Sequence, residues 1–260
     1  TESHLSETRS LTLSGLLEKN ARIHGDEVAV VGEDGEELTY SQLDDSVNRL
    51  ARGLSERGFG YGDTIAVLSE NRREFVELYY AGSRLGAPVA AQNWRLEKSE
   101  LLHCLNVVDA DIVFVSEQNS EKIEWIEAAD TISSEIVGLD SGIASTCYTD
   151  VMSDEAERYD SPGDSEDIAA ILYTSGTTGL PKGAAISNRA FIARGMARHV
   201  MGLHTKDQPD NIAWLPMFHM ASADFVATVA LQGGTYYPID GFKPGVVLDT
   251  LERSETRLLL

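Results

Sequence analysis

The sequence predicts an α/β fold built of layered, largely parallel sheets with helices on both faces. Helical and strand patterns alternate along the first 150 residues, and such alternation is typical of parallel sheets covered by crossover helices. With 42% hydrophobic and 24% charged residues, the 260-residue chain has an ordinary globular composition. This composition excludes disordered, collagen-like and disulfide-framework proteins.

The first elements are a helix, a strand and a second helix. A helical stripe at residues 13–17 precedes a buried strand over residues 27–32. The second helix begins near Ser41, a plausible N-cap, and stops at Gly58. Its buried face is formed by Leu43, Val47, Leu50, Ala51 and Leu54.

Three glycines, Gly58, Gly60 and Gly62, lead into a strand over residues 64–69. A dinucleotide-binding fingerprint needs such glycines after a strand and at the start of a helix. Here the order is reversed, so we interpret the cluster as a plain turn between a helix and a strand.

The alternation continues beyond this strand. Asn71 is predicted to cap a helix whose apolar face spans residues 75–85, and a strand follows over residues 87–92. A helix over residues 97–107 and a strand over residues 111–116 complete the pattern.

Residues 133–166 are rich in Ser, Asp and Glu and include the turn sequence Pro-Gly-Asp, so we expect a linker or an exposed connection there. This expectation divides the chain in two. We expect residues 1–160 to form a first α/β subdomain and residues 161–260 to begin a second one.

The net charge of −21 argues against nucleic acid and anionic membrane surfaces as partners. Between Asp167 and Asp207 there is no acidic residue, and five bases lie in this stretch: Lys182, Arg189, Arg194, Arg198 and Lys206. Two interpretations remain open: the stretch binds a small polyanion, or the acidic residues are unevenly distributed along the chain without functional meaning. Residues 1–10 do not resemble a leader, and no long apolar run is present, so we expect a cytoplasmic protein without membrane insertion.

The cysteines and histidines give no sign of a metal site. Cys104 and Cys147 are too far apart in sequence for a metal-ligand or redox pair, and we expect ordinary structural thiols. The six histidines lack the spacings typical of zinc sites.

The segment most informative about chemistry is a buried strand at residues 168–173 followed directly by a glycine-rich loop. Gly176 and Gly179 can adopt positive φ and turn backbone N–H groups toward an anion. Lys182 adds a positive charge. Hydroxyl groups come from Thr174, Ser175, Thr177 and Thr178. The spacing differs from that of a Walker A loop, and a disordered connector would not explain the preceding strand. The segment therefore predicts a different kind of phosphate loop.

Residues 173–183, which read YTSGTTGLPKG, closely resemble the signature loop of one superfamily of adenylate-forming enzymes. Its members are the AMP-forming acyl-CoA synthetases, the luciferases and the peptide-synthetase adenylation domains. Further matches are LTYSQL at residues 38–43 and NWRL at residues 93–96, the latter as in fatty and aryl acyl-CoA synthetases. WLPMFHM at residues 214–220 resembles a wall of the acyl pocket, whereas Asn188 stands where many members carry His.

The resemblance implies an acid-CoA ligase for a fatty or aryl acid. The carboxylate would attack the α-phosphate of ATP to give an acyl-adenylate and pyrophosphate, and coenzyme A would then displace AMP. The loop would bind the β- and γ-phosphates together with Mg²⁺, with Lys182 stabilising the developing charge. His219 would orient the carboxylate or close the pocket, although a lone histidine among apolar residues is often structural.

Family members are about twice as long. The resemblance therefore implies that residues 1–260 are the N-terminal portion of the large domain and an inactive fragment. It also implies that the second subdomain, residues 161–260, is incomplete and that the C-terminal lid domain is absent. Two other enzymes remain open, an adenylation domain that loads a carrier protein and an oxidative luciferase-like relative. A non-catalytic ATP-binding module is the alternative outside the enzyme class. The apolar run at residues 258–260 suggests a sheet edge through which two copies could associate.

Overall fold

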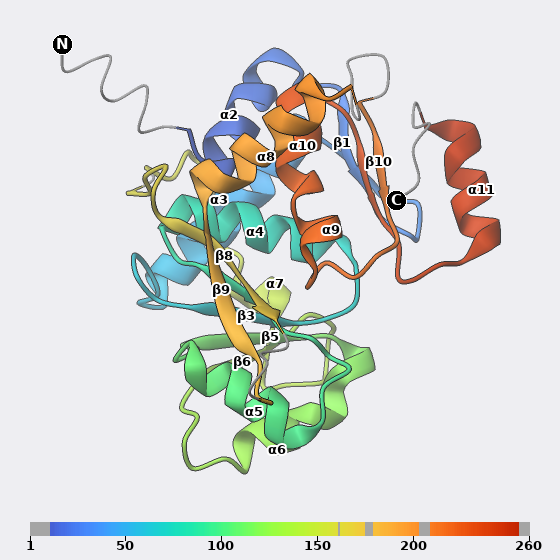
Figure 1. Cartoon of the computed structure of the whole chain (residues 1–260). Coiled ribbons are helices and arrows are strands. Elements are labelled where there is room, and N and C mark those ends of the chain that lie inside the picture. Colours follow the sequence, from blue (N-terminus) through green and yellow to red (C-terminus); the bar gives the residue numbers. More distant parts are fainter. Residues whose placement is uncertain (1–10, 161, 175–178, 203–208, 255–260) are drawn as a thin grey trace.

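The computed structural model describes residues 11–160, 162–174, 179–202 and 209–254 (Figure 1). They form a seven-stranded sheet in the order β7-β6-β5-β3-β4-β8-β9 and a four-stranded sheet in the order β10-β11-β1-β2. The large sheet is parallel except for the antiparallel pair β8–β9. In the small sheet β1 pairs in parallel with β11 and antiparallel with β2. The predicted class of layered, largely parallel sheets is confirmed.

The strands are short, as is usual for buried parallel sheets. Their bounds in the large sheet are Ile65–Leu68 for β3, Val89–Ala91 for β4, Ile112–Val115 for β5, Glu135–Gly138 for β6, Thr146–Cys147 for β7, Ile168–Thr174 for β8 and Lys182–Ser187 for β9. In the small sheet they are Val28–Val31 for β1, Glu37–Thr39 for β2, Asn211–Ala213 for β10 and Tyr236–Pro238 for β11.

The helices cover both faces of the large sheet (Figure 1). Their bounds are Leu13–Ile23 for α2, Tyr40–Glu56 for α3, Arg73–Leu85 for α4, Lys98–Val107 for α5, Ile123–Glu127 for α6, Tyr148–Val151 for α7, Asn188–Val200 for α8, Met220–Ala223 for α9, Phe225–Gln232 for α10 and Pro244–Arg253 for α11. A 3₁₀ helix, η1, spans Glu117–Lys122.

Alternate side chains of β3 enter two different cores. Ile65 and Val67 belong to the larger core, which also contains apolar residues of α2, α3, α4, α8 and α10 and of the small sheet. Ala66 and Leu68 belong to the second core, formed with α5 and α6. Because successive strand residues point to opposite faces, all four are buried and the strand reads as a continuous apolar run.

Two predicted helix caps are wrong. The N-cap of α3 is Thr39 rather than Ser41, because Thr39 and Gln42 form a reciprocal capping box. The N-cap of α4 is Arg72 rather than Asn71, because the Asn71 side chain is used for bonds to another part of the fold.

The predicted linker at residues 133–166 is also partly wrong, since β6, β7 and α7 lie within it. Val137 of β6 is fully buried. Its strand has only four residues, so its apolar signal is lost among the surrounding polar residues. Both sheets take strands from either side of residue 160, and the division of the chain at that point stays a prediction.

Within the described ranges, none of the helices combines the length and the hydropathy that crossing a bilayer requires.

Candidate functional site

The predicted phosphate loop connects two antiparallel strands. Thr174 ends β8 and pairs directly with Lys182, the first residue of β9. Gly179 has a φ of +105° and open space where a Cβ would lie, so the chain turns there without steric cost. Lys182 is exposed and forms no ion pair with any described residue. The lysine is thus available to an anion at this edge of the sheet.

The four central loop residues Ser175, Gly176, Thr177 and Thr178 lie outside the described residues. Their predicted contact with phosphate therefore stays a prediction.

Side chains from two neighbouring elements fix both ends of this loop. The Tyr173 hydroxyl donates to the Cys104 carbonyl and accepts from Gln92 Nε2, both at 2.9 Å. His103 Nε2 donates to the Pro181 carbonyl at 3.1 Å. These contacts hold the loop ends against β4 and α5. These contacts could not be predicted from the sequence, because partners 69 to 81 residues apart leave no local pattern.

The base-rich stretch is largely neutralised by carboxylates from outside it. Arg189 pairs with Glu166 at 2.5 Å. Arg194 and Arg198 both pair with the fully buried Asp224. Lys206 lies outside the described residues. A polyanion site spread over the whole stretch is therefore not supported. Among the described bases of the stretch, Lys182 is the one that is exposed and forms no ion pair.

Asn71 fixes the segment that was matched to the acyl-pocket wall. Its Nδ2 donates to the carbonyls of Ala213, Leu215 and Ile239 at 2.7 to 3.0 Å, and its Oδ1 accepts from Met217 N at 2.7 Å. Asn71 lies at the end of β3 and these partners belong to the chain around β10 and β11. One buried amide thus links the two sheets where residues 214–219 pass.

His219 is held in this segment as the N-cap residue of α9. Its ring lies 4.6 Å from the ring of Phe218 (centroid to centroid), and Phe218 meets Trp94 edge-on at 6.3 Å. Partial burial lowers the pKa of His219, and the nearby positive charge of Arg95 lowers it further. The imidazole is therefore mainly neutral at pH 7.

Asn188, the departure from the family pattern, has a structural role. Its Oδ1 accepts from Leu13 N at 3.0 Å and from the Ser83 hydroxyl at 2.8 Å. It follows β9 directly and so ties the β8–β9 hairpin to α2 and α4.

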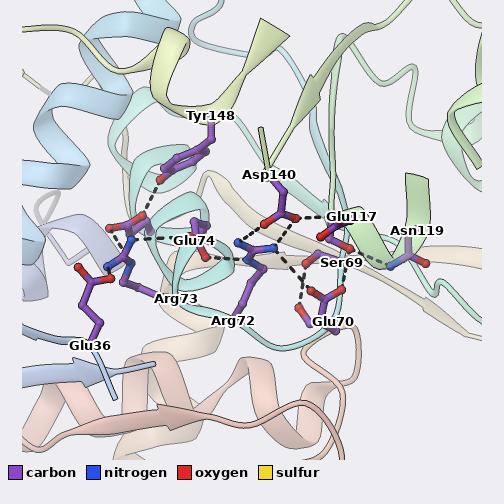
Figure 2. A network of polar contacts seen from close by, with 12 residues as sticks. Glu36, Ser69, Glu70, Arg72, Arg73, Glu74, Glu117, Asn119, Asp140 and Tyr148 are labelled. Atoms are coloured by element: carbon purple, nitrogen blue, oxygen red, sulfur yellow. Dashed lines mark hydrogen bonds and ion pairs between the residues drawn. The ribbon is translucent and has the colours of Figure 1, made fainter. Parts of the chain in front are cut away.

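A polar cleft of about 360 Å³ opens where the turn after β1 meets the start of α4. Figure 2 shows Arg72 directed at Glu74 and Asp140, with Glu36 beside Arg73. Lys243 pairs with Glu33 across the cleft at 2.6 Å. The charged side chains of the cleft pair mainly with one another. We therefore interpret this network as a structural link between the turn after β1, the start of α4 and the chain around residues 140 and 243, and not as a ligand site.

The described residues contain no group of three or more metal-ligating side chains. Cys104 and Cys147 are free thiols, and burial raises the pKa of Cys104 to about 12, which makes it an inert, buried group.

Comparison with known proteins identifies the family. Residues 17–259 match the family described as AMP-binding enzyme. The chain belongs to this family.

Among curated relatives, a 2-succinylbenzoate–CoA ligase from Oceanobacillus iheyensis is 32% identical over 232 residues, covering 87% of this chain and 44% of that protein. A 4-hydroxybutyrate–CoA ligase from Metallosphaera sedula is 32% identical over 240 residues, covering 86% and 42%. The chain thus spans less than half the length of these relatives.

Among solved structures, an o-succinylbenzoate coenzyme A synthetase from Bacillus subtilis, in complex with ATP and magnesium, superposes with a TM-score of 0.79. It is 21% identical, and the match covers 94% of this chain and 62% of that one. This likeness shows the fold of adenylate-forming enzymes.

Proposed function

We propose that this chain is the N-terminal portion of an AMP-forming acid-CoA ligase acting on a fatty or aryl acid. The observation that carries the proposal is the β8–β9 hairpin, which presents exposed Lys182 beside the phosphate loop in a chain that belongs to the AMP-binding enzyme family. The curated relatives named above are both CoA ligases.

The residues fit the phosphates of ATP. Open space at Gly179 and the exposed ammonium of Lys182 leave room for an anion next to the loop. In our proposal Lys182 and the loop residues Thr174, Ser175, Gly176, Thr177, Thr178 and Gly179 bind the β- and γ-phosphates. Their N–H and hydroxyl donors stabilise the charge that develops on pyrophosphate as it leaves.

Magnesium would partly neutralise the phosphates, but the described residues offer no cluster of ligands for it. We therefore assign it no protein ligand.

His219 contributes by orienting the acid. A neutral imidazole donates or accepts a hydrogen bond without adding charge, and His219 lies beside Phe218 at the end of the Asn71-bound segment. We propose that it positions the carboxylate for attack on the α-phosphate, and that coenzyme A then takes the acyl group.

The acid itself is not selected by the comparisons, because an aryl-acid ligase and a hydroxyalkanoic-acid ligase match this chain at equal identity.

The test uses the whole protein with ATP, Mg²⁺ and a panel of hexanoate, dodecanoate, benzoate, 2-succinylbenzoate and 4-hydroxybutyrate. We expect acid-dependent exchange of pyrophosphate into ATP, and AMP release that requires free coenzyme A. Exchange without coenzyme A-dependent AMP release would instead support an adenylation domain that loads a carrier protein. ATP binding without exchange for any acid would support a non-catalytic module.

A further inference from the structure

Arg95 occupies an unusual position at the carboxyl edge of the large sheet. It lies four residues after the end of β4, and its guanidinium carbon stands 4.8 Å from the ring centroid of Trp94 and 5.9 Å from that of Phe218. The two rings meet edge-on. Cation–π attraction to both rings holds the guanidinium in place without using its hydrogen-bond donors.

Those donors have no protein partner in the described part of the chain. The Arg95 side chain forms no ion pair and no hydrogen bond there, whereas Arg72, Arg84 and Arg198 all pair with carboxylates. Arg95 is also exposed. A guanidinium with a fixed plane and free N–H groups matches the two oxygens of a carboxylate.

The position of Arg95 relative to His219 is set by Phe218. The positive charge of Arg95 is close enough to lower the pKa of His219. The ring centroids of His219 and Phe218 are 4.6 Å apart. Among the described residues this places a fixed cation and a neutral hydrogen-bonding ring at one aromatic surface.

We propose that Arg95 binds the carboxylate of the acid substrate before adenylation, with the Trp94 ring contacting the carbon atoms next to it. The proposal rests on the proposed function, whose substrate-binding surface it extends. Arg95 is then a specificity-determining residue that favours ionised acids over neutral compounds of the same shape.

A carboxylate suits this place better than a nucleotide phosphate. The surface is aromatic on one side and cationic on the other, which fits a ligand whose charged group is attached to an apolar body. The phosphate loop instead offers hydroxyls, glycine N–H groups and Lys182, without aromatic rings beyond Tyr173. Phosphate binding by Arg95 is a separate outcome of the experiment.

The experiment measures KM for the acid and for ATP in pyrophosphate exchange, with the acid of the panel that the wild-type protein uses best. Arg95→Met removes the charge and keeps an unbranched apolar stem, whereas Arg95→Lys keeps the charge and loses the planar fork. Arg22→Met, at an exposed arginine of α2 without an ion pair to described residues, is the matched control. The primary amide of the same acid is tested as a competitive inhibitor in each variant.

For Arg95→Met we expect KM for the acid to rise about ten- to a hundredfold, as for a lost charge-assisted contact, while KM for ATP changes less than about twofold. Arg95→Lys is expected between wild type and Arg95→Met, and Arg22→Met unchanged. The inhibition constant of the neutral amide should stay constant, because it offers no charge to lose.

An unchanged KM for the acid in Arg95→Met overturns the proposal. A rise confined to the KM for ATP also overturns it, because Arg95 would then bind phosphate. An equal loss of affinity for the acid and for its amide overturns it as well, because it would indicate a purely structural role. Absence of exchange in the wild-type protein would contradict the proposed function itself, and is thereby distinguished from a failure at Arg95.

Discussion

Lys182 is the residue whose role can be tested most directly. It is exposed at the start of β9, so Lys182→Ala should leave folding intact. In the whole protein we expect pyrophosphate exchange to fall about ten- to a hundredfold, because a charge-assisted contact to phosphate contributes roughly 1.5 to 3 kcal/mol. Lys19→Ala, at an exposed lysine on α2, is the control. An exchange rate equal to that of wild type would remove Lys182 from the phosphate site.

Glu77 gives a prediction about pH. Its carboxylate is 2% exposed and accepts hydrogen bonds from Ser46 at 2.8 Å and Tyr148 at 2.6 Å. Burial raises its pKa above the usual 4.5. The folded state therefore binds the proton of the Glu77 carboxyl group more tightly than the unfolded state does. Protonated Glu77 stabilises the folded protein fully below pH 4.5, and this stabilisation is lost as pH rises through the pKa of Glu77 in the folded state.

Glu77→Gln removes this titration and keeps the shape of the side chain. Relative to the variant, the wild-type protein should therefore lose stability as pH rises from about 4.5 toward neutrality. Urea unfolding of both proteins at a series of pH values measures the difference. Free energies of unfolding that run parallel over this range would contradict the raised pKa.

At the scale of elements, the connection between the two sheets depends on Asn71. Asn71→Ala leaves up to three carbonyls and one N–H without their partner. Each unsatisfied buried group costs about 1 to 3 kcal/mol, and partial relaxation brings the expected loss of unfolding free energy to about 2 to 5 kcal/mol.

Denaturant unfolding checks this value. Asn106→Ala is the matched control. Asn106 is exposed, and among the described residues its side-chain amide donates only to the Leu102 carbonyl and the Thr131 hydroxyl, so the substitution should change stability by less than about 0.5 kcal/mol. Equal effects of the two substitutions would show that Asn71 is not the connection we describe.

The elements also show what the sequence could predict. The sequence predicts the strands β1, β3, β4, β5 and β8 from short continuous apolar runs, and the helices α3, α4 and α5 from helical patterns. Both signals are local in the chain. The partners of Asn71 lie about 140 to 170 residues away, so a helix cap was the only role its sequence position suggested. At the site, the loop motif indicated Lys182, while the aromatic contacts of Arg95 depend on residues 94 and 218 meeting in space.

For the whole molecule, we expect a protein of residues 1–260 to fold but not to form acyl-adenylate. We propose that this chain supplies the phosphate loop. It covers less than half of the curated relatives named above, and we expect the adenine, ribose and magnesium contacts to need the part of such a protein that it does not cover. ATP affinity should accordingly be weak. Calorimetric titration with ATP and an acyl-adenylate assay test this against the whole protein. Turnover of about 1 to 1,000 per second, a rate typical of enzymes, would show that the fragment contains a complete site.

The pairing of β1 with β11 joins Val30 to Tyr236, and this has a consequence for biosynthesis. At about 5 to 20 residues per second on the ribosome, roughly 10 to 40 s pass between synthesis of the two strands. During this time β1 has only β2 as a partner, and its other hydrogen-bonding edge is open to strands of other nascent chains. Chaperone binding to the emerging N-terminal strands should therefore end only after residue 240 has left the ribosomal tunnel.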